Sequence, residues 1–390
     1  MVSISYNPYE GVIWSDLTMP EAGIPPKWEG HCHPRASAPH PYNKPHGVID
    51  LYSGDIADDD GNDIVEPYTL FGPTFSDDPS YWPWSALTDL SSEFEDRDPE
   101  TVRDGDGVIA CPTGEMHFGV HTTCLFWGGD FTDIRLGGIP EKLRDPVTKS
   151  NLGEPGAIVG FAHPHRYWAG DKPTGRDYEQ YLFNMEGMLN HDGAIVMELF
   201  SRLGGFPTRD IILWDKLLTD FATEGLIWGL GHDDPVEASG QNRLYRVGDS
   251  VDCRWTSVLL HNDEFDVSDQ SSSRQATHDA IKDGRIFAHE RNRWDPDSET
   301  PADPPMPTEI DVNDESITIE YDDGSGGETV VKWISSGEVV TTGPTITLDD
   351  SHFPYVRAQL ETGSNIDTES VIDEDIDAIT ATQPWMIAHS

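Results

Sequence analysis

The stretch TRDIILWDKLLTDFATEGLIWGLGHDD, residues 208–234, decides the expected fold because it joins a helix pattern directly to a strand pattern. A capping residue, Thr208, opens the helix pattern and Gly225 closes it. The run LIWGLG that follows is a short apolar strand pattern. Three polar residues come directly after that run: His232, Asp233 and Asp234.

The same alternation of short apolar strands and helices extends on both sides of this stretch. Further strand patterns lie within 107–118, 156–166, 193–202, 254–260 and 286–290. Helical spacing covers 177–190, and a Ser-capped helix is expected over 271–285. Strands that alternate with helices predict a parallel sheet covered by helices. Polar residues recur at the C-terminal strand ends, where an α/β barrel builds its active site.

A change of period near residue 300 predicts a second domain. Residues 294–308 are rich in Pro and Asp and read as a linker, and the chain beyond them alternates with a period of two. We therefore expect a larger domain at 1–300 and a small antiparallel β domain at 301–390. The larger domain includes an irregular, aromatic-rich segment at about 35–105. Within it, the aromatic residues of 71–89 would form either a lid over the barrel mouth or a contact surface for another protein chain.

The net charge and the small number of lysines indicate the salt concentration at which the protein is expected to work. The 390 residues carry a formal charge of -46, and eight of the 25 basic residues are lysines. A carboxylate surface with few lysines suits multimolar salt, where repulsion between charges is screened within a few Å. The 38 aromatic residues argue against a disordered acidic chain. We expect a halophilic protein that does not bind nucleic acid unless metal ions mask its charge.

Neither a membrane-spanning apolar run nor a secretory signal is expected from the sequence. The four cysteines are scattered without a CxxC pair, which is typical of reduced thiols rather than of a disulfide framework. The expected location is therefore the cytoplasm of a halophile, or a virion if the chain is viral.

Residue types that bind metals recur at successive strand ends. They are His31 and His33, then Glu115, His117 and His121, then His163 and His165, then Glu198, and then His232, Asp233 and Asp234. In a strand, residues i and i+2 point to one face, so His31 and His33 can reach one ion. A single histidine at a strand end is more often a hydrogen-bonded structural residue. The ordered set instead favours Zn, Mn or Fe bound by imidazole and carboxylate.

The order HCH, GEMHFGVH, AHP, MEL, GHDD and HDAIKDGRIF resembles the PHP superfamily, named for polymerase and histidinol phosphatase domains. The resemblance covers roughly residues 28–290 and is closest to stand-alone metallohydrolases with a C-terminal β domain. It implies a distorted (β/α)7 TIM-like barrel with two or three divalent ions that activate water against phosphate esters.

The resemblance also implies a role for each matching residue. The implied metal ligands are His31, His33, Glu115, His121, His163 and Asp234. One ion would be bound by His31, His33, Glu115 and Asp234, and the other by Glu115, His121 and His163. His117 stays an alternative to His121, and Asp233 an alternative to Asp234. His165 and Arg166 follow His163 and would hold a phosphate, and the alternative for Arg166 is a surface ion pair with one of the many acidic residues. Asp233 would act in catalysis, and Glu198, His232 and Asp89 would orient the ligands.

Two departures from the family pattern concern a third ion. Val236 and Leu90 stand where the family has histidines. The third metal site is therefore expected to be absent, or rebuilt from His40, His46 or His232, and two ions are expected in all.

The sequence thus predicts a metal-dependent phosphoesterase acting on a small-molecule or glycan phosphate ester. One alternative is a structural or binding component of a halophile virion or surface assembly, with protein partners and with catalysis reduced or lost. Another is a hydrolase of amides or carbamates, because the same activated hydroxide can attack a carbonyl.

Overall fold

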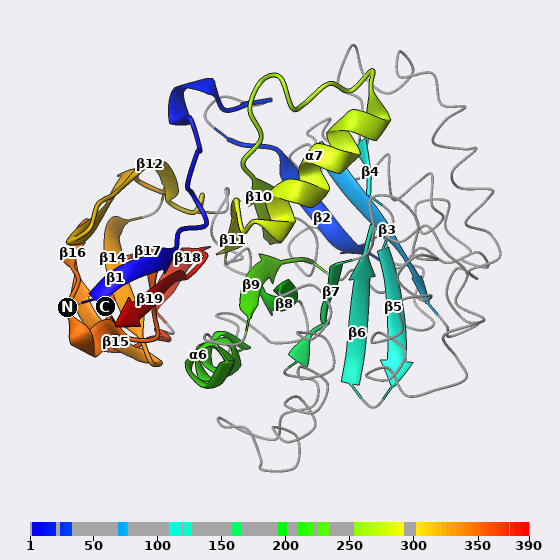
Figure 1. The fold of residues 1–390 in the computed structure, drawn as a ribbon. Helices are drawn as coiled ribbons and strands as arrows, with labels where there is room; N and C mark the ends of the chain where they lie inside the picture. Colours follow the sequence, from blue (N-terminus) through cyan, green and yellow to red (C-terminus); the bar gives the residue numbers. More distant parts are fainter. Residues whose placement is uncertain are drawn as a thin grey trace.

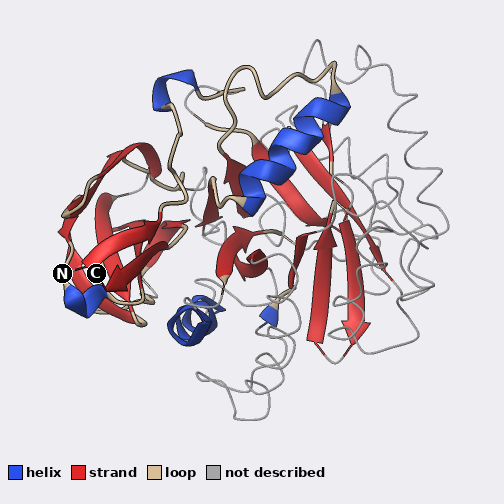
Figure 2. Cartoon of the chain, viewed as in Figure 1, coloured by secondary structure: helices blue, strands red, loops and turns tan. Residues whose placement is uncertain are grey.

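The computed structural model describes residues 2–20, 24–32, 69–76, 109–111, 113–118, 120–126, 158–164, 194–200, 210–221, 225–233, 253–291, 302–325, 327–373 and 375–389. Every structural statement below concerns these residues. Strands dominate them (Figure 2), and two α-helices occur among them, α6 (Asp210–Phe221) and α7 (Gln270–Lys282). Two 3₁₀ turns complete this set, η1 (Trp14–Asp16) and η8 (Asp350–His352).

The predicted α/β fold, a distorted (β/α)7 TIM-like barrel, is wrong. The described part of the chain is mainly β, and its sheets do not form a closed barrel. The prediction took the short apolar runs, which alternate with helix patterns, as strands of one parallel sheet covered by helices. An apolar run shows only that both faces of a strand are covered, and this also holds for antiparallel strands inside a large mixed sheet.

Most of the molecule is built on one twisted mixed sheet (Figure 1). Ten of its strands are β2 (Lys27–Cys32), β3 (Leu70–Ser76), β4 (Ile109–Ala110), β5 (Thr113–Phe118), β6 (Val120–Leu125), β7 (Ile158–Phe161), β8 (Ala194–Phe200), β9 (Leu226–Gly231), β10 (Arg254–Val258) and β11 (Ile286–Arg291). They run in the order β11-β10-β2-β3-β5-β6-β7-β8-β9, with β4 beside β3. Pairing is parallel for β2–β3, β3–β4, β3–β5, β7–β8 and β8–β9, and it is antiparallel for β11–β10, β10–β2, β5–β6 and β6–β7.

Strand β3 falls inside the segment of about 35–105 that was predicted to be irregular. Its parallel pairing with β2 and β5 places residues 70–76 within the sheet. The remainder of that segment lies outside the described residues, as do the predicted helix over 177–190 and the predicted Thr208 cap.

The C-terminal residues form antiparallel strands that also use the N-terminus. They are β12 (Met306–Val312), β13 (Ser316–Asp322), β14 (Glu328–Ser335), β15 (Glu338–Thr342), β16 (Thr345–Thr347), β17 (Tyr355–Gly363), β18 (Ile376–Thr382) and β19 (Trp385–His389). Strand β1 (Val2–Tyr6) pairs with β19, and β18 pairs with β11. Two pairings therefore cross the predicted domain boundary near residue 300, and both chain ends lie on the same side of the molecule (Figure 1).

Helix α6 covers β8 and β9 through an apolar stripe. Ile211, Trp214 and Leu218 are buried at helical spacing, each stabilising the fold by roughly 1.5–3 kcal/mol. Trp214 Nε1 also donates a hydrogen bond of 3.0 Å to the carbonyl of Ile227 on β9. The helix thereby fixes the strand that leads to His232.

Strands β14, β15, β17, β18 and β19 continue the large mixed sheet beyond β11, and we call them the C-terminal sheet. A buried charge network joins α6 to this C-terminal sheet, and we call it the Asp215–Arg357 network. Arg357 Nε and Nη2 donate to the two carboxylate oxygens of Asp215, both at 2.7 Å. Tyr355 Oη donates to Asp215 Oδ1 at 2.9 Å. The network continues through Gln359, Glu361 and Lys332. All six side chains are buried, so this contact is shielded from bulk solvent and pairs two carboxylates with two cations.

The end signals of the two helices differ partly from the prediction. Asp269, not a serine, is the N-cap of α7, and its carboxylate accepts a hydrogen bond of 3.1 Å from Ser272 N. The predicted terminal glycine of this helix is Gly284, whose φ of 74° suits glycine. Helix α6 ends at Phe221, and Gly225 N donates to the carbonyl of Phe221.

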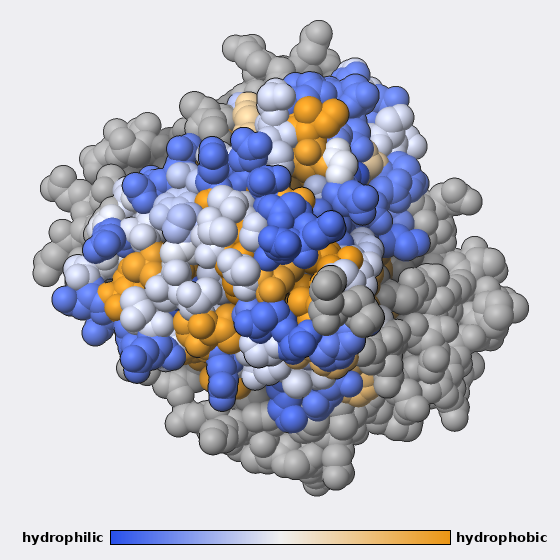
Figure 3. Space-filling model, turned by 60° about the vertical axis from the view of Figure 1, so that its left-hand side comes forward, coloured by the Kyte–Doolittle hydropathy of each residue, from blue (hydrophilic) through white to orange (hydrophobic). Residues whose placement is uncertain are grey.

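The face shown in Figure 3 is mainly hydrophilic, with small separate apolar patches. Among the described residues, four large apolar side chains are exposed: Ile13, Met19, Val340 and Phe353. Within the same ranges, no helix has the length and apolar character that crossing a membrane requires.

Candidate functional site

Four polar residues lie at one end of adjacent strands. They are His121 on β6, His163 just after β7, Glu198 on β8 and His232 just after β9. Because β6 runs antiparallel to β7, its first residues lie beside the end of β7. His121 is half-buried and the other three are almost fully buried. We call these four residues the histidine–glutamate cluster.

The two imidazoles at one end of this cluster face each other. His121 Nδ1 and His163 Nε2 are 3.3 Å apart, and the ring planes are inclined by 69°. That separation is long for an N–H hydrogen bond, whose heavy atoms are typically about 2.9–3.0 Å apart. Two imidazoles bound to one tetrahedral zinc at roughly 2.0–2.1 Å would have nitrogens about 3.3–3.4 Å apart. The separation therefore fits both a long hydrogen bond between the two imidazoles and two ligands of one ion.

The backbone at His163 is held in an unusual conformation. Its φ is 28°, and the next residue is Pro164, which disfavours helical backbone at the residue before it. Such a conformation costs on the order of 1–3 kcal/mol and persists only where the surroundings hold it. Glu198 Oε2 accepts a hydrogen bond of 2.7 Å from His163 N, and Ala162 N donates to the carbonyl of His121. These bonds fix the imidazole of His163 beside β6.

The other carboxylate oxygen of Glu198 reaches the third histidine. Glu198 Oε1 is 3.6 Å from His232 Nδ1. The ring of His232 packs edge-on against Trp28, with ring centres 4.8 Å apart. A Cβ atom on Gly30 would lie 2.8 Å from His232 Cε1 and Nε2 and would overlap the Trp28 indole. Glycine is therefore required at position 30, directly before His31 on β2.

Asp233 has a structural environment. Its Oδ1 accepts hydrogen bonds from Cys253 N at 3.0 Å and Arg254 N at 2.9 Å. Its own N–H donates to Glu29 Oε2 at 2.8 Å. Burial alone would lower the pKa of Arg254, but Glu290, Cys253 and Asp233 raise it above its ordinary value. These contacts tie the end of β9 to β2 and β10, and the predicted catalytic role of Asp233 stays a prediction.

The structure brings together two of the predicted ligands, His121 and His163. For His31 on β2 and Glu115 on β5 it describes the backbone alone, and Glu115 is paired with Thr123 on β6. The remaining predicted site residues lie outside the described residues: His33, Asp89, His165, Arg166 and Asp234. Among the side chains that the structure describes, no group of three or more His, Cys, Asp or Glu could hold a metal ion.

Sequence reasoning missed Glu29. Its side chain is fully buried, and it connects β2 to the residue that follows His232. The signal was present, because a carboxylate stands in the middle of the short strand pattern KWEGHC, two residues before His31. A charged residue inside a buried strand normally has a partner of its own.

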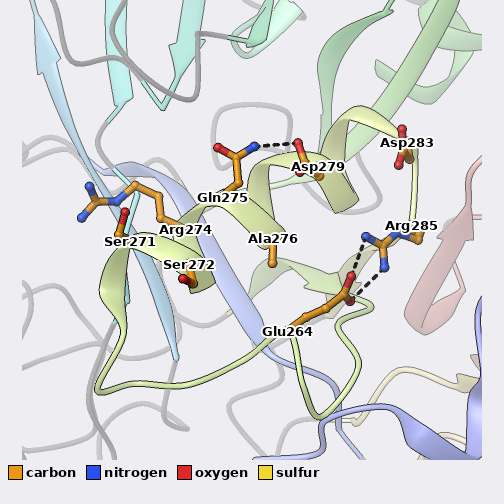
Figure 4. Close-up of a pocket in the computed structure, with 9 residues that line it drawn as sticks. All are labelled: Glu264, Ser271, Ser272, Arg274, Gln275, Ala276, Asp279, Asp283 and Arg285. Atoms are coloured by element: carbon orange, nitrogen blue, oxygen red, sulfur yellow. Dashed lines mark hydrogen bonds and ion pairs between the residues drawn. The ribbon is translucent and has the colours of Figure 1, made fainter.

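A surface hollow of about 680 Å³ beside α7 is a weaker candidate (Figure 4). Arg285 donates to both carboxylate oxygens of Glu264 at 3.1 and 3.3 Å, and Gln275 donates to Asp279. Asp283 adds another carboxylate to the lining. The ion pair of Arg285 with Glu264 is complete within the hollow, and the other acidic side chains named lie beside it. We therefore take the histidine–glutamate cluster as the candidate site.

No family model matches the chain, and no curated protein and no solved structure matches it either. The resemblance to the PHP superfamily therefore rests on the sequence motifs quoted above.

Proposed function

We propose that the chain is a metal-dependent hydrolase whose site includes the histidine–glutamate cluster. The observation that carries this proposal is the 3.3 Å separation of His121 Nδ1 and His163 Nε2 in a largely buried setting. Paired imidazoles with nearby carboxylates suit Zn, Mn or Fe. The order of histidine and carboxylate motifs along the chain supports the same chemistry.

His121 and His163 would hold one divalent ion. The predicted ligands that would complete a two-ion site are His31, His33, Glu115 and Asp234. A bound ion of this kind supplies a water of lowered pKa as the nucleophile. Glu198 holds the backbone of His163 and lies beside the ring of His232, so it orients the histidines around the ion.

A phosphate ester is the proposed substrate class. This part of the proposal comes from the sequence resemblance, in which His165 and Arg166 follow the ligand His163. A guanidinium offers a fork of donors that matches phosphate oxygens. The charge of -46 favours a small or neutral-bodied ester over a nucleic acid, which the acidic surface would repel.

Metal content tests the proposal. The wild-type chain and the double variant His121→Ala/His163→Ala are dialysed in multimolar KCl, and Zn, Mn and Fe are measured by elemental mass spectrometry. The double variant His261→Ala/His352→Ala is the matched control, because it removes two histidines from other elements. Hydrolysis of p-nitrophenyl phosphate is measured on the same samples with and without a chelator.

We expect about two ions per wild-type chain and an unchanged content in the control. The His121/His163 variant should lose at least one ion and its hydrolytic activity. Equal metal content in the two double variants would exclude the cluster as the site. A wild-type chain that binds no metal and cleaves no ester would overturn the proposal and direct attention to a structural role.

A further inference from the structure

Side chains, not a strand, pair with the edge of β9 that faces away from β8. Gln383 lies between β18 and β19, and its Oε1 accepts from Gly229 N at 2.7 Å while its Nε2 donates to Gly229 O at 2.9 Å. Thr256 on β10 repeats this arrangement two residues further on, with Oγ1 3.1 Å from both Gly231 N and Gly231 O. Each side chain supplies the donor and the acceptor that a neighbouring strand would supply.

Glycine at position 231 allows this close approach. A Cβ atom there would lie 2.6 Å from the carbonyl oxygen of Trp255 and 2.8 Å from that of His289. The end of β9 therefore rests directly on the backbones of β10 and β11. On its other side, His232 N donates to the carbonyl of Phe200 at 3.0 Å.

Gln383 is itself held rigidly. Its side chain is fully buried, and its backbone N–H donates to Tyr9 Oη at 2.8 Å. Tyr9 Oη in turn donates to the carbonyl of Ile286 at 3.2 Å. Burial raises the pKa of Tyr9 above its ordinary value, so the neutral phenol is retained and can both accept and donate. The N-terminal segment, the C-terminal sheet and β11 thus meet at this glutamine.

We propose that Gln383 is a positioning residue for the candidate site. Its two hydrogen bonds fix Gly229 in β9. Gly231 lies two residues further along this strand, and His232 follows it directly. A displacement of this strand end would move the ring of His232 relative to Glu198 Oε1, which is 3.6 Å away. Glu198 transmits the change to His163, because its carboxylate accepts a hydrogen bond from the backbone N–H of His163. The C-terminal sheet is then part of the site rather than an appended module.

The expected effect on metal binding rests on the proposed function, whereas the effect on His232 requires no metal. The positioning role of Gln383 and the proposed metal-dependent function can therefore fail independently in one set of experiments. The key variant is Gln383→Met, which keeps the length of the side chain and removes both hydrogen bonds to Gly229.

The chain offers a matched control one residue earlier. Thr382 Oγ1 accepts from Ala358 N at 2.9 Å and donates to Ala358 O at 3.2 Å, which is the same kind of contact made within the C-terminal sheet. Thr382→Val removes that contact and the contact of the Thr382 side chain with Tyr9, and it leaves both hydrogen bonds between Gln383 and Gly229 in place. Both full-length variants are labelled with ¹³C in the histidine rings, and the His232 resonance is assigned with His232→Gln. Zn²⁺ affinity by chelator competition and urea unfolding at constant KCl complete the comparison.

We expect both variants to lose stability, but only Gln383→Met should shift the His232 ring resonance in metal-free protein. The same variant should bind Zn²⁺ about 10-fold or more weakly than wild type, as expected for loss of an orienting contact. Gln383→Glu keeps the acceptor for Gly229 N and loses the donor to Gly229 O when its carboxyl group is ionised, so at high pH it should give an intermediate shift, and it serves if the methionine variant does not fold.

An unmoved His232 resonance in the folded Gln383 variants, or equal shifts in the Thr382→Val control, would overturn the positioning role. A shifted resonance in a chain that binds no Zn²⁺ would uphold that role and reject the proposed function. Normal Zn²⁺ binding in every variant, with His232 unmoved, would reject the positioning role alone.

Discussion

Two buried polar regions of this molecule differ in how their charged and hydrogen-bonding side chains are paired. In the Asp215–Arg357 network, a guanidinium faces a carboxylate at 2.7 Å through both oxygens, and a phenol adds a third donor. In the histidine–glutamate cluster, groups of the same kind meet instead. One imidazole faces another at 3.3 Å, and a carboxylate lies between the backbone of His163 and the ring of His232.

This difference separates two uses of buried polarity. A donor–acceptor network with opposite charges completes itself, and its effect is to hold α6 against the C-terminal sheet. Imidazoles and carboxylates are the groups that bind Zn, Mn or Fe in proteins, so under the proposed function a cation would be bound here. The first region should therefore govern stability, and the second should govern binding.

The largest expected effect comes from breaking the first region. Asp215→Ala leaves the buried guanidinium of Arg357 without its carboxylate, and loss of one member of a buried ion pair typically destabilises by about 3–5 kcal/mol. We expect a loss of this size in the free energy of unfolding. Urea titration at constant KCl, followed by tryptophan fluorescence, measures it.

The double variant Asp215→Leu/Arg357→Met provides the control. It replaces both charges by apolar groups, so it should be more stable than Asp215→Ala alone, because no buried charge is left over. A double variant as unstable as the sum of its two single variants would contradict a coupled network.

The next largest effect on stability comes from His289, whose two ring nitrogens face hydroxyl groups, unlike the facing imidazoles of the cluster. His289 on β11 is buried between Thr380 and Ser257, with Nδ1 2.8 Å from Thr380 Oγ1 and Nε2 3.0 Å from Ser257 Oγ. Burial, with Lys27 and Arg291 nearby, lowers the pKa of His289 to about 3. The unfolded chain binds a proton near pH 6.5 and the folded chain does not, so this site destabilises the fold as pH falls from about 6.5 to 3.

His289→Gln removes this titration. Between pH 7 and pH 4.5 the wild type should lose about 2.5 kcal/mol more stability than the variant. Urea unfolding of both chains at the two pH values measures the difference. Parallel losses in the two chains would show that the imidazole of His289 is charged in the fold, contrary to its environment.

A third change acts at the border of the cluster. Gly30→Ala places a methyl group 2.8 Å from the His232 ring and into the Trp28 indole, and overpacking of this kind typically costs about 1–3 kcal/mol. We also expect displacement of the His232 ring resonance. Gly343→Ala is the control, because its φ of 107° strains alanine while nothing lies within 4 Å of the new methyl group. A displaced His232 in both variants would contradict the local clash.

Much of the local structure follows from the sequence, but the topology does not. The helical spacing around Trp214 and the alternation in SITIEYD correspond to α6 and β13, because one buried face imposes a period on the chain. The period carries no information on strand direction. The runs TGEMHF and VHTTCL pair as an antiparallel hairpin, and this contributes to the failure of the barrel prediction.

The candidate site was predictable to the extent that it lies at strand ends. His121, His163, Glu198 and His232 were singled out because chemically useful side chains follow apolar runs. Gln383 could not be found in this way, and the only signal for Glu29 was a carboxylate inside a buried strand pattern. Their roles depend on which strands meet across the sheet, and residues 29 and 383 are brought to β9 and its end only by the three-dimensional fold.

The smallest expected effect on stability comes from the half-buried member of the cluster, and it sharpens the comparison with the Asp215–Arg357 network. In chelator, His121→Ala should change the free energy of unfolding by less than about 1 kcal/mol, because the lost contact is long and partly solvated. With Zn²⁺ at 100 times its Kd, wild type should gain about 2.7 kcal/mol by linkage, and the variant should gain far less. Arg357→Met provides the inverse case, because it should be unstable in chelator yet retain a Zn²⁺-dependent gain. An equal Zn²⁺-dependent gain in His121→Ala and wild type would mean that the ion binds elsewhere, and the contrast between the two buried regions would then be one of packing alone.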